Sequence, residues 1–375
     1  MKPPTDDEKT RIASAFLSGQ ALERLTRYDH YFNYYEQCFA GLPDNSFFQN
    51  DRPASSTHEG VVSSFDRLIG NVEQTEANFR DTFDQGVSNT TRTHAIRALL
   101  YTSLMVYNYE YNFPAHQVRD FVPQSWGQHQ PFDEFVKGYF PPLDQSPEVR
   151  KEARSALEQR RRLTARRLEE RHKVRLRITD NLAEHLVFDK DRRVLYIFRH
   201  IGFLKAHLER PIRRDHGVDI GFADSLRKGT LPPQLLLEIM NSIQYLLFPL
   251  EDRSFELARK FIDKYDFDPE LGNFQAYTHG VSGNFEYKYL AGRVATLLEV
   301  ANSPMPATSR FTVWVEENTS ERNALTVAIL GLFLSVLLGF LGLITGIISA
   351  IYTIKQYNVA VQALHTPPNL SQRYQ

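Results

Sequence analysis

The sequence lacks most features that assign a chain quickly to a class. Its 375 residues include one cysteine, Cys38, so no intrachain disulfide can form. Lys and Arg number 44 against 45 Asp and Glu, which excludes a globally basic nucleic-acid binder. A mean hydropathy of −0.40 excludes a transporter with many membrane spans. No apolar segment follows the polar N-terminal residues, so we expect no cleaved secretory signal.

Aromatic residues are plentiful, with 26 Phe and 18 Tyr, and this excludes wholesale disorder. Apolar residues recur three or four apart before residue 300, which predicts an all-α fold of helical bundles with an aromatic-rich core. Cys38 lies in such a pattern, and we interpret it as a small buried apolar residue rather than a nucleophile.

Composition predicts five regions. They are an N-terminal aromatic-rich bundle with a Pro-rich connector (1–145), a helical region that begins with a long basic helix (146–302), a juxtamembrane hinge (303–323), a transmembrane helix (324–354) and a short tail (355–375). Within the second region, Ser146, Pro147 and Glu148 supply an N-cap, a first-turn proline and a first-turn acid, so the long helix begins there and could run past Leu186. Further helices are expected over 192–208, 232–248, 252–265 and 285–302.

One uncharged run stands out, from Ala324 to Ile354. As a helix it would reach about 46 Å, longer than the ~30 Å hydrocarbon core, so one tilted span is expected. Small residues recur along it three or four apart, a pattern that lets a second helix approach closely. This stripe predicts association of two copies through the membrane helix, and its members are Gly331, Ser335, Gly339, Gly342, Gly346 and Ala350.

The position of this run predicts a tail-anchored protein whose N-terminal domain lies in the cytosol. The membrane that holds the anchor is expected to be the endoplasmic reticulum or another endomembrane. Asn369 then lies in a sequon on the far side and is a candidate for glycosylation, whereas Asn89 and Asn318 stay unmodified.

A basic block runs from Ser146 to Arg214, with 20 Lys and Arg against 10 Asp and Glu. It is either a solvated helix face, a contact with anionic lipid, or a contact with an acidic protein partner. Nucleic acid is the least expected partner, because no recognition motif accompanies the charges. The densest residues of this patch are Arg160, Arg161, Arg162, Arg166, Arg167, Arg171 and Lys173.

Searches for chemistry return weak patterns, so no catalytic residue, metal ligand or cofactor is predicted. His200 and His207 are seven apart, which is too far for a helical metal pair. The acids at 266, 268 and 270 fit a helix N-cap with a first-turn acid better than a calcium loop. The glycines at 280 and 283 fit a turn better than a phosphate cradle.

The layout of a helical part, a lead-in of Trp314 and Glu321-Arg322-Asn323, and one C-terminal span resembles that of single-pass membrane proteins of filamentous fungi. Some such proteins look like remnants of CorA-type magnesium channels. Those channels carry a Gly-Met-Asn motif and a second span, and both are missing here, which speaks against metal transport.

The leading hypothesis is therefore a membrane-anchored helical scaffold or adaptor that binds the bilayer, a cytosolic protein and a second copy of itself. The alternative is a membrane-tethered enzyme or pore-type effector with an unrecognised helical site. Clustering of His200, His207 or Asp268 in a cleft would favour the enzyme.

Overall fold

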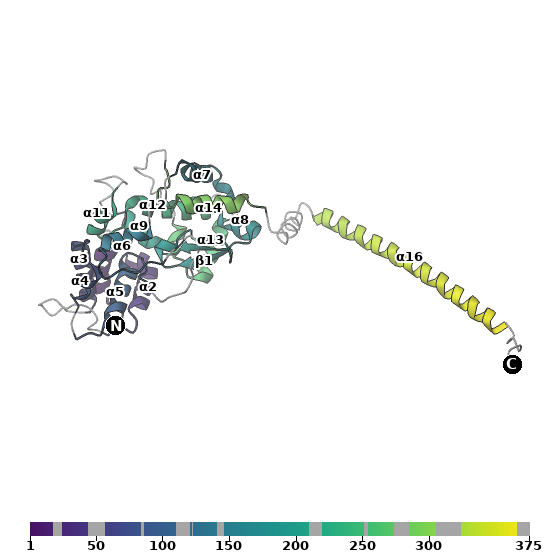
Figure 1. Cartoon of the computed structure of the whole chain (residues 1–375), viewed down its shortest axis with the longest axis horizontal. Helices are drawn as coiled ribbons and strands as arrows, with labels where there is room; N and C mark the ends of the chain where they lie inside the picture. Colours follow the sequence, from purple (N-terminus) through teal and green to yellow (C-terminus); the bar gives the residue numbers. More distant parts are fainter. Residues whose placement is uncertain are drawn as a thin grey trace, which may run out of the picture. The chain divides into compact units, whose positions relative to one another are not determined.

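The computed structural model describes residues 1–17, 25–43, 57–83, 86–109, 121, 123–140, 146–209, 220–250, 254–273, 285–304 and 324–365. The chain divides into two units, Met1–Pro306 and Ala307–Gln375. Helices dominate both units, which confirms the predicted fold class (Figure 1).

The first part of unit 1 consists of short helices that follow one another along the chain. An example of local control is α1, where Thr5 and Glu8 form a capping box with both reciprocal bonds present. The elements are α1 (Asp6–Ile12), the π-helical turn η1 (Ala13–Leu17), α2 (Asp29–Phe39), α3 (Thr57–Gly70), α4 (Glu76–Arg80), α5 (Asn89–Ser103) and α6 (Phe132–Tyr139).

The second part mixes helices with a small sheet. The helices are α7 (Pro147–Glu158), the single turn η3 (Arg160–Arg162), α8 (Ala165–His172), the turn η4 (Leu182–Glu184), α9 (Ile201–Leu208), α11 (Phe222–Arg227), α12 (Pro233–Asn241), η5 (Ser242–Leu247), α13 (Ser254–Tyr265), η6 (Pro269–Gly272) and α14 (Ala291–Asn302). The strands are β1 (Arg175–Thr179), β2 (Phe188–Asp189) and β3 (Val194–Phe198).

The prediction of one long basic helix is wrong, although its start is correct, because Ser146 caps α7 and Pro147 occupies its first turn. The helix stops at Glu158. Thr164 caps a new helix, α8, and Lys173 ends that helix in the left-handed region at φ 52°. The chain then enters β1, so charge density in this block did not reflect helical continuity.

The expected helix over 192–208 is wrong in its first half. Val194–Phe198 forms β3, which pairs in parallel with β1 and antiparallel with β2, in the order β1-β3-β2. The register places Thr179 opposite Phe198 at the carboxyl ends of the two parallel strands. A run of Val, Leu, Tyr, Ile and Phe suits a strand buried on both faces, which a helical spacing test does not distinguish from a buried helix.

Other helices agree more closely with the prediction. The expected helix over 232–248 corresponds to α12 and η5, and the one over 252–265 to α13. The helix expected over 285–302 begins only at Ala291. The backbone N–H groups of residues 288–290 donate to the side chain of Glu238 on α12 instead of starting the helix.

One apolar core joins residues from both parts of unit 1. Its largest fully buried side chains are aromatic and include Phe16, Tyr31, Tyr35, Phe65 and Phe198, in agreement with the predicted aromatic core. Helix α7 packs along α14, and Figure 1 shows α8 beside them at the end of the unit away from α3 and α4.

The helix of unit 2, α16, covers Ala324–His365. Its segment Leu334–Val359 has a mean hydropathy of 2.3 and no buried side chains, so it is long and apolar enough to cross a membrane.

Candidate functional site

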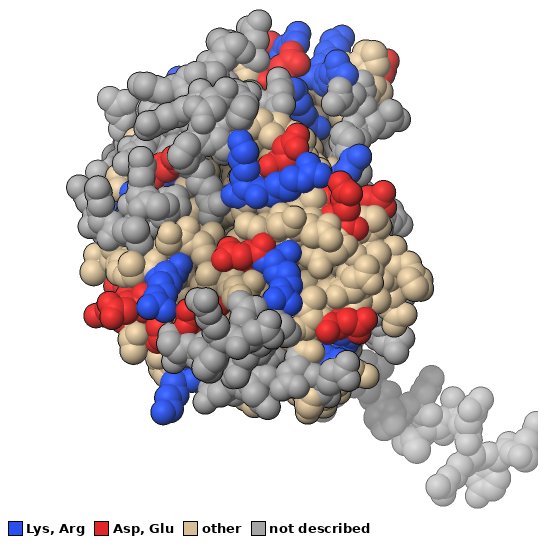
Figure 2. All heavy atoms as spheres, turned by 90° about the vertical axis from the view of Figure 1, so that its left-hand side faces the viewer, with Lys and Arg blue, Asp and Glu red and all other residues tan. Residues whose placement is uncertain are grey.

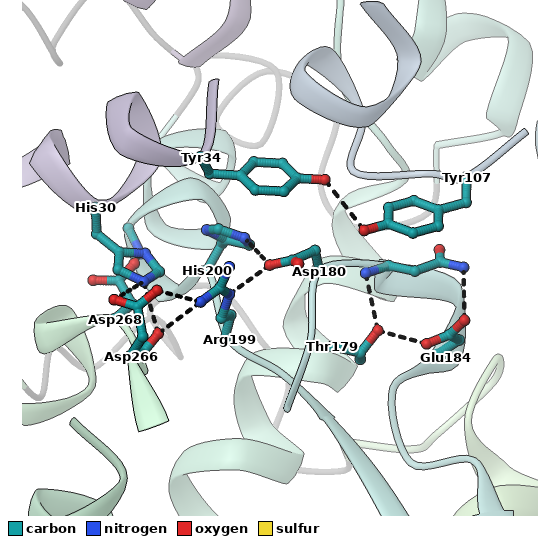
Figure 3. A network of polar contacts seen from close by, with 12 residues as sticks. His30, Tyr34, Tyr107, Thr179, Asp180, Glu184, Arg199, His200, Asp266 and Asp268 are labelled. Carbon is teal, nitrogen blue, oxygen red and sulfur yellow. Dashed lines mark hydrogen bonds and ion pairs between the residues drawn. The ribbon is translucent and has the colours of Figure 1, made fainter. Parts of the chain in front are cut away.

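A polar network lies where the carboxyl ends of β1 and β3 meet. Asp180 follows β1, and Arg199 and His200 follow β3. Because parallel strands end at the same sheet edge, their following residues come together there. Figure 3 shows these three side chains pointing toward one another. Asp180 is not among the residues predicted from the sequence, because the strand that positions it, β1, was not predicted either.

Asp180 accepts hydrogen bonds from two partners through the same oxygen. Its Oδ1 lies 2.7 Å from His200 Nε2 and 2.5 Å from Arg199 Nε. Burial opposes ionisation of Asp180, but the hydrogen bonds from His200 and Arg199 outweigh it and lower its pKa. Burial also lowers the pKa of His200, despite the carboxylate at its Nε2. The site therefore holds an ionised Asp180, a neutral His200 and a charged Arg199.

This protonation state assigns the tautomer of His200. Its Nε2 carries the proton and donates a hydrogen bond to Asp180, which leaves Nδ1 as an acceptor. This Nδ1 atom has no hydrogen-bond partner among the described residues. The His200 ring has no exposed surface. An acceptor without a partner in such a place costs stability.

Helix α2 packs against the network through two side chains that contact the ring of His200. The Tyr34 ring lies 4.6 Å from the His200 ring, and the His30 ring lies 5.0 Å away, between centroids. His30 Nε2 lies 2.9 Å from the backbone oxygen of Asp266, and Asp266 Oδ2 lies 2.5 Å from Arg199 Nη1. The network thus runs from Asp180 through Arg199 to Asp266 at the surface (Figure 3).

A second arm extends along β1. Thr179 Oγ1 donates to Glu184 at 2.5 Å, and Tyr109 donates to the other oxygen of Glu184 at 2.6 Å. Asn181 Nδ2 lies 3.2 Å from the Tyr109 hydroxyl, and the Asn181 Oδ1 atom caps η4 through Ala183. These bonds fix the turn after β1, and with it the position of Asp180.

The acids at 266–270 serve different partners. Asp268 Oδ2 accepts the N–H of Gly202 at 2.6 Å, and its Oδ1 caps η6, which confirms the predicted N-cap. A Cβ at Gly202 would lie 3.2 Å from Asp268 Oδ2, so glycine allows this close approach. Glu270 binds the buried ammonium of Lys205 at 2.9 Å and Arg27 at 2.8 Å. Residues 266–270 therefore bond to α9 and hold it in place, which is a structural role.

The remaining candidate histidine lies elsewhere. His207 Nδ1 is 2.8 Å from Thr230 Oγ1. His200 and Asp268 both lie at the start of α9, whereas His207 lies nearly two helical turns further along. Among the described residues, no group of three or more His, Cys, Asp or Glu is placed to hold a metal ion.

Two further residues, His185 and Cys38, belong to reactive residue types but are not arranged for nucleophilic catalysis. His185 Nδ1 accepts the N–H of Phe198, so its Nε2 carries the proton and donates to Ser242 Oγ at 2.6 Å. This is the reverse of the direction in which a general base activates serine. Cys38 is half-buried, less than predicted, and packs against the core. Burial raises its pKa to about 12, which keeps the thiol protonated.

Two cavities among the described residues of unit 1 are lined by neither His200 nor Asp180. One, of about 450 Å³, has mainly apolar and aromatic walls with Lys190 and Arg293 at its border. The other, of about 470 Å³, lies between the N-terminal residues and α2 and includes Asp266. Of the network described above, Asp266 lines the second of these cavities.

The residues of the predicted basic patch do not form one helix face. Arg160, Arg161 and Arg162 are exposed in η3, and Lys173 is exposed after α8. Three others lie on α8 and are half-buried: Arg166, which pairs with Glu170 at 2.6 Å, Arg167 and Arg171.

The predicted small-residue stripe, Gly331, Ser335, Gly339, Gly342, Gly346 and Ala350, falls on α16. Trp314, the segment 321–323, the glycines at 280 and 283, and Asn369 lie outside the described residues. Comparison of the chain with protein-family models, characterised proteins and solved structures gives no match. Function is therefore inferred from geometry.

Proposed function

We propose that the chain is a single-pass membrane protein whose unit 1 acts as a scaffold or adaptor in the cytosol. The observation that carries the proposal is the contrast between the two units. Unit 1 buries its large apolar side chains in one core, whereas none of the window Leu334–Val359 is buried among the described residues. A helix of this kind needs lipid around it.

The polar network supports a binding role more than a catalytic one. Its acids and bases are bonded to one another, and His200 has no exposed surface for a substrate to reach. Such a network fixes the relative positions of α2, α9 and the sheet. A rigid unit on a membrane tether suits the presentation of a surface to a protein partner.

The test uses the full chain in native membranes. Replacing Leu338 and Leu341 with Arg places two charges in the apolar segment, and we expect the variant to leave the membrane on alkaline extraction, whereas Leu338→Ala with Leu341→Ala stays. Retention of the Arg variant would contradict the anchor. Proximity labelling should then identify a cytosolic protein that is labelled by the anchored chain and lost with the Arg variant.

A buried enzyme site is the second candidate, and the unpartnered Nδ1 of His200 beside Asp180 is the observation in its favour. An enzyme predicts that His200→Gln abolishes the cellular role of a chain that remains folded and still labels its partner. A scaffold predicts that loss of the role follows loss of the partner.

A further inference from the structure

We propose that an exposed cationic surface on η3, the end of α8 and the edge of β1 binds anionic lipid headgroups of the membrane that holds the chain. The residues that we group as this cationic surface are all exposed and come from three elements that follow one another along the chain: Arg160, Arg161, Arg162, Lys173, Arg175 and Arg177. The inference rests on the proposed anchor and names a second, electrostatic contact with the same bilayer.

The first observation is that these charges are poorly neutralised within the protein. Arg160, Arg161, Lys173 and Arg177 have no acidic partner among the described residues. Arg162 donates to a neutral amide, Asn302, at 2.8 Å, and Arg175 donates to the backbone oxygen of Arg192 at 2.9 Å. Two acids of the same region are engaged elsewhere, since Glu170 pairs with Arg166 and Glu299 lies 3.7 Å from Lys190.

The second observation is how the backbone presents the charges. In β1 the arginines at 175 and 177 are exposed while Leu176 and Ile178 turn inward, which is the alternation of a strand with one wet face. β1 is an edge strand, since only β3 pairs with it. Helix η3 buries none of its three arginines. Consecutive exposed guanidinium groups suit phosphate and carboxylate headgroups, which accept two hydrogen bonds at once.

The third observation is the position of the surface in the chain. Arg162 bonds to Asn302, the last residue of α14 and four residues before the end of unit 1 at Pro306. Residues 307–323 then lead to α16, and a chain of that length spans at most about 60 Å. Few residues of chain therefore separate Asn302, which Arg162 contacts, from the start of α16, and such a tether makes contact with lipid an intramolecular event.

The opposite end of unit 1 differs. Figure 2 shows that face with blue and red side chains interspersed. Exposed cations elsewhere in unit 1 also have acidic partners, since Arg227 pairs with Asp224 and Glu73, each at 3.0 Å. Because the net charge of the whole chain is −1, the cationic surface is a local feature and not a general property of the protein. This favours an oriented contact over a diffuse attraction.

The test measures the distance from the cationic surface to lipid headgroups in the full chain. Glu158→Cys, in a Cys38→Ala background, carries a fluorophore beside η3, and Asp66→Cys carries it on α3 as a reference. Each chain is reconstituted into nanodiscs that contain a nitroxide-headgroup lipid. The discs are made of phosphatidylcholine alone or with about one-third phosphatidylserine.

We expect phosphatidylserine to increase quenching at position 158 and not at 66, and salt at about 1 M, where the Debye length is about 3 Å, to reverse it. Each cation removed should lower the contact equilibrium about five-fold, so the triple variant R160Q/R161Q/R162Q should lower it about a hundredfold. The matched control R11Q/R227Q/K228Q removes three exposed charges elsewhere and should retain the response.

Equal quenching in both discs would overturn the inference. A response at position 158 to soluble polyglutamate, with none to phosphatidylserine, would overturn it in favour of an acidic protein partner. Insertion into discs is scored separately by flotation. A chain that fails to insert contradicts the proposed anchor, whereas a chain that inserts without a lipid response contradicts only the lipid contact.

Discussion

His200 donates its Nε2–H to Asp180 Oδ1 over 2.7 Å while its ring is completely buried. The two residues are 20 positions apart and follow two parallel strands. Arg199 also bonds Asp266, and His30 of α2 lies 2.9 Å from the backbone oxygen of Asp266, so the network joins the sheet edge, α2 and the segment after α13.

The first prediction concerns that carboxylate. Asp180→Asn removes the ionised acceptor shared by His200 and Arg199, and we expect the free energy of unfolding to fall by about 2–4 kcal/mol. Denaturant titration of the detergent-solubilised chain measures the change. Asp191→Asn, at an exposed residue of the same region, should change it by less than about 0.5 kcal/mol. Equal effects of the two substitutions would contradict a structural role for Asp180.

Acidification should weaken the fold through two buried histidines. Burial lowers the pKa of His200 and lowers that of His185 well below 6.5. Below pH 6.5 these histidines are protonated in the unfolded chain but stay neutral in the folded chain. The free energy of unfolding therefore falls by about 1.4 kcal/mol per pH unit for each histidine, until the pH reaches its folded pKa. Imidazole NMR titration checks this directly, and a His185 signal that titrates near 6.5 would refute it.

Glu238 predicts the opposite pH dependence. Its carboxyl group accepts the N–H groups of Lys288, Tyr289 and Leu290 and the amide of Gln234. Burial nevertheless raises its pKa to about 7, against the effect of these donors. Between pH 4.5 and 7 the folded chain therefore holds a proton that the unfolded chain releases, and stability falls by about 1.4 kcal/mol per pH unit.

The measurement for Glu238 is the difference between wild type and Glu238→Gln across this pH range. Because Gln does not titrate, the difference isolates the carboxyl group from the histidines. We expect the wild type to lose its advantage over the variant as the pH rises from 4.5 to 7. A difference that is constant with pH, or grows, would show that Glu238 is ionised throughout.

The small-residue stripe predicts association within the bilayer. Gly342→Leu with Gly346→Leu fills the surface by which a second helix would approach, so crosslinked dimer should decrease several-fold. Ile344→Leu with Ile348→Leu lies on the opposite side of the helix, conserves volume and should leave the dimer unchanged. Crosslinking of the full chain in membranes is the readout, and unchanged dimer in the Gly variant would remove the stripe from the proposal.

Asn369 tests the proposed orientation. In an endoplasmic reticulum anchor with unit 1 in the cytosol, Asn369 faces the lumen, and we expect a mobility shift on endoglycosidase treatment that Asn369→Gln abolishes. Asn89→Gln should have no effect on that shift. A glycan that maps to Asn89 would place unit 1 on the luminal side.

The sequence by itself determined the features that depend on neighbours along the chain. The apolar helix, the cap at Ser146, the cap at Asp268 and the aromatic character of the core all follow from residue type and spacing within a few positions. These features define the helical class of the fold and the segment able to cross a membrane.

Only the tertiary structure decided the polar network and the path of the basic block. Thr164 and Lys173 divide that block, and the alternation from Arg175 to Ile178 makes a strand because β3 is available to pair with it. Asp180 meets His200 for the same reason. Strand pairing depends on residues distant in sequence, and no local spacing encodes which distant strand will be the partner.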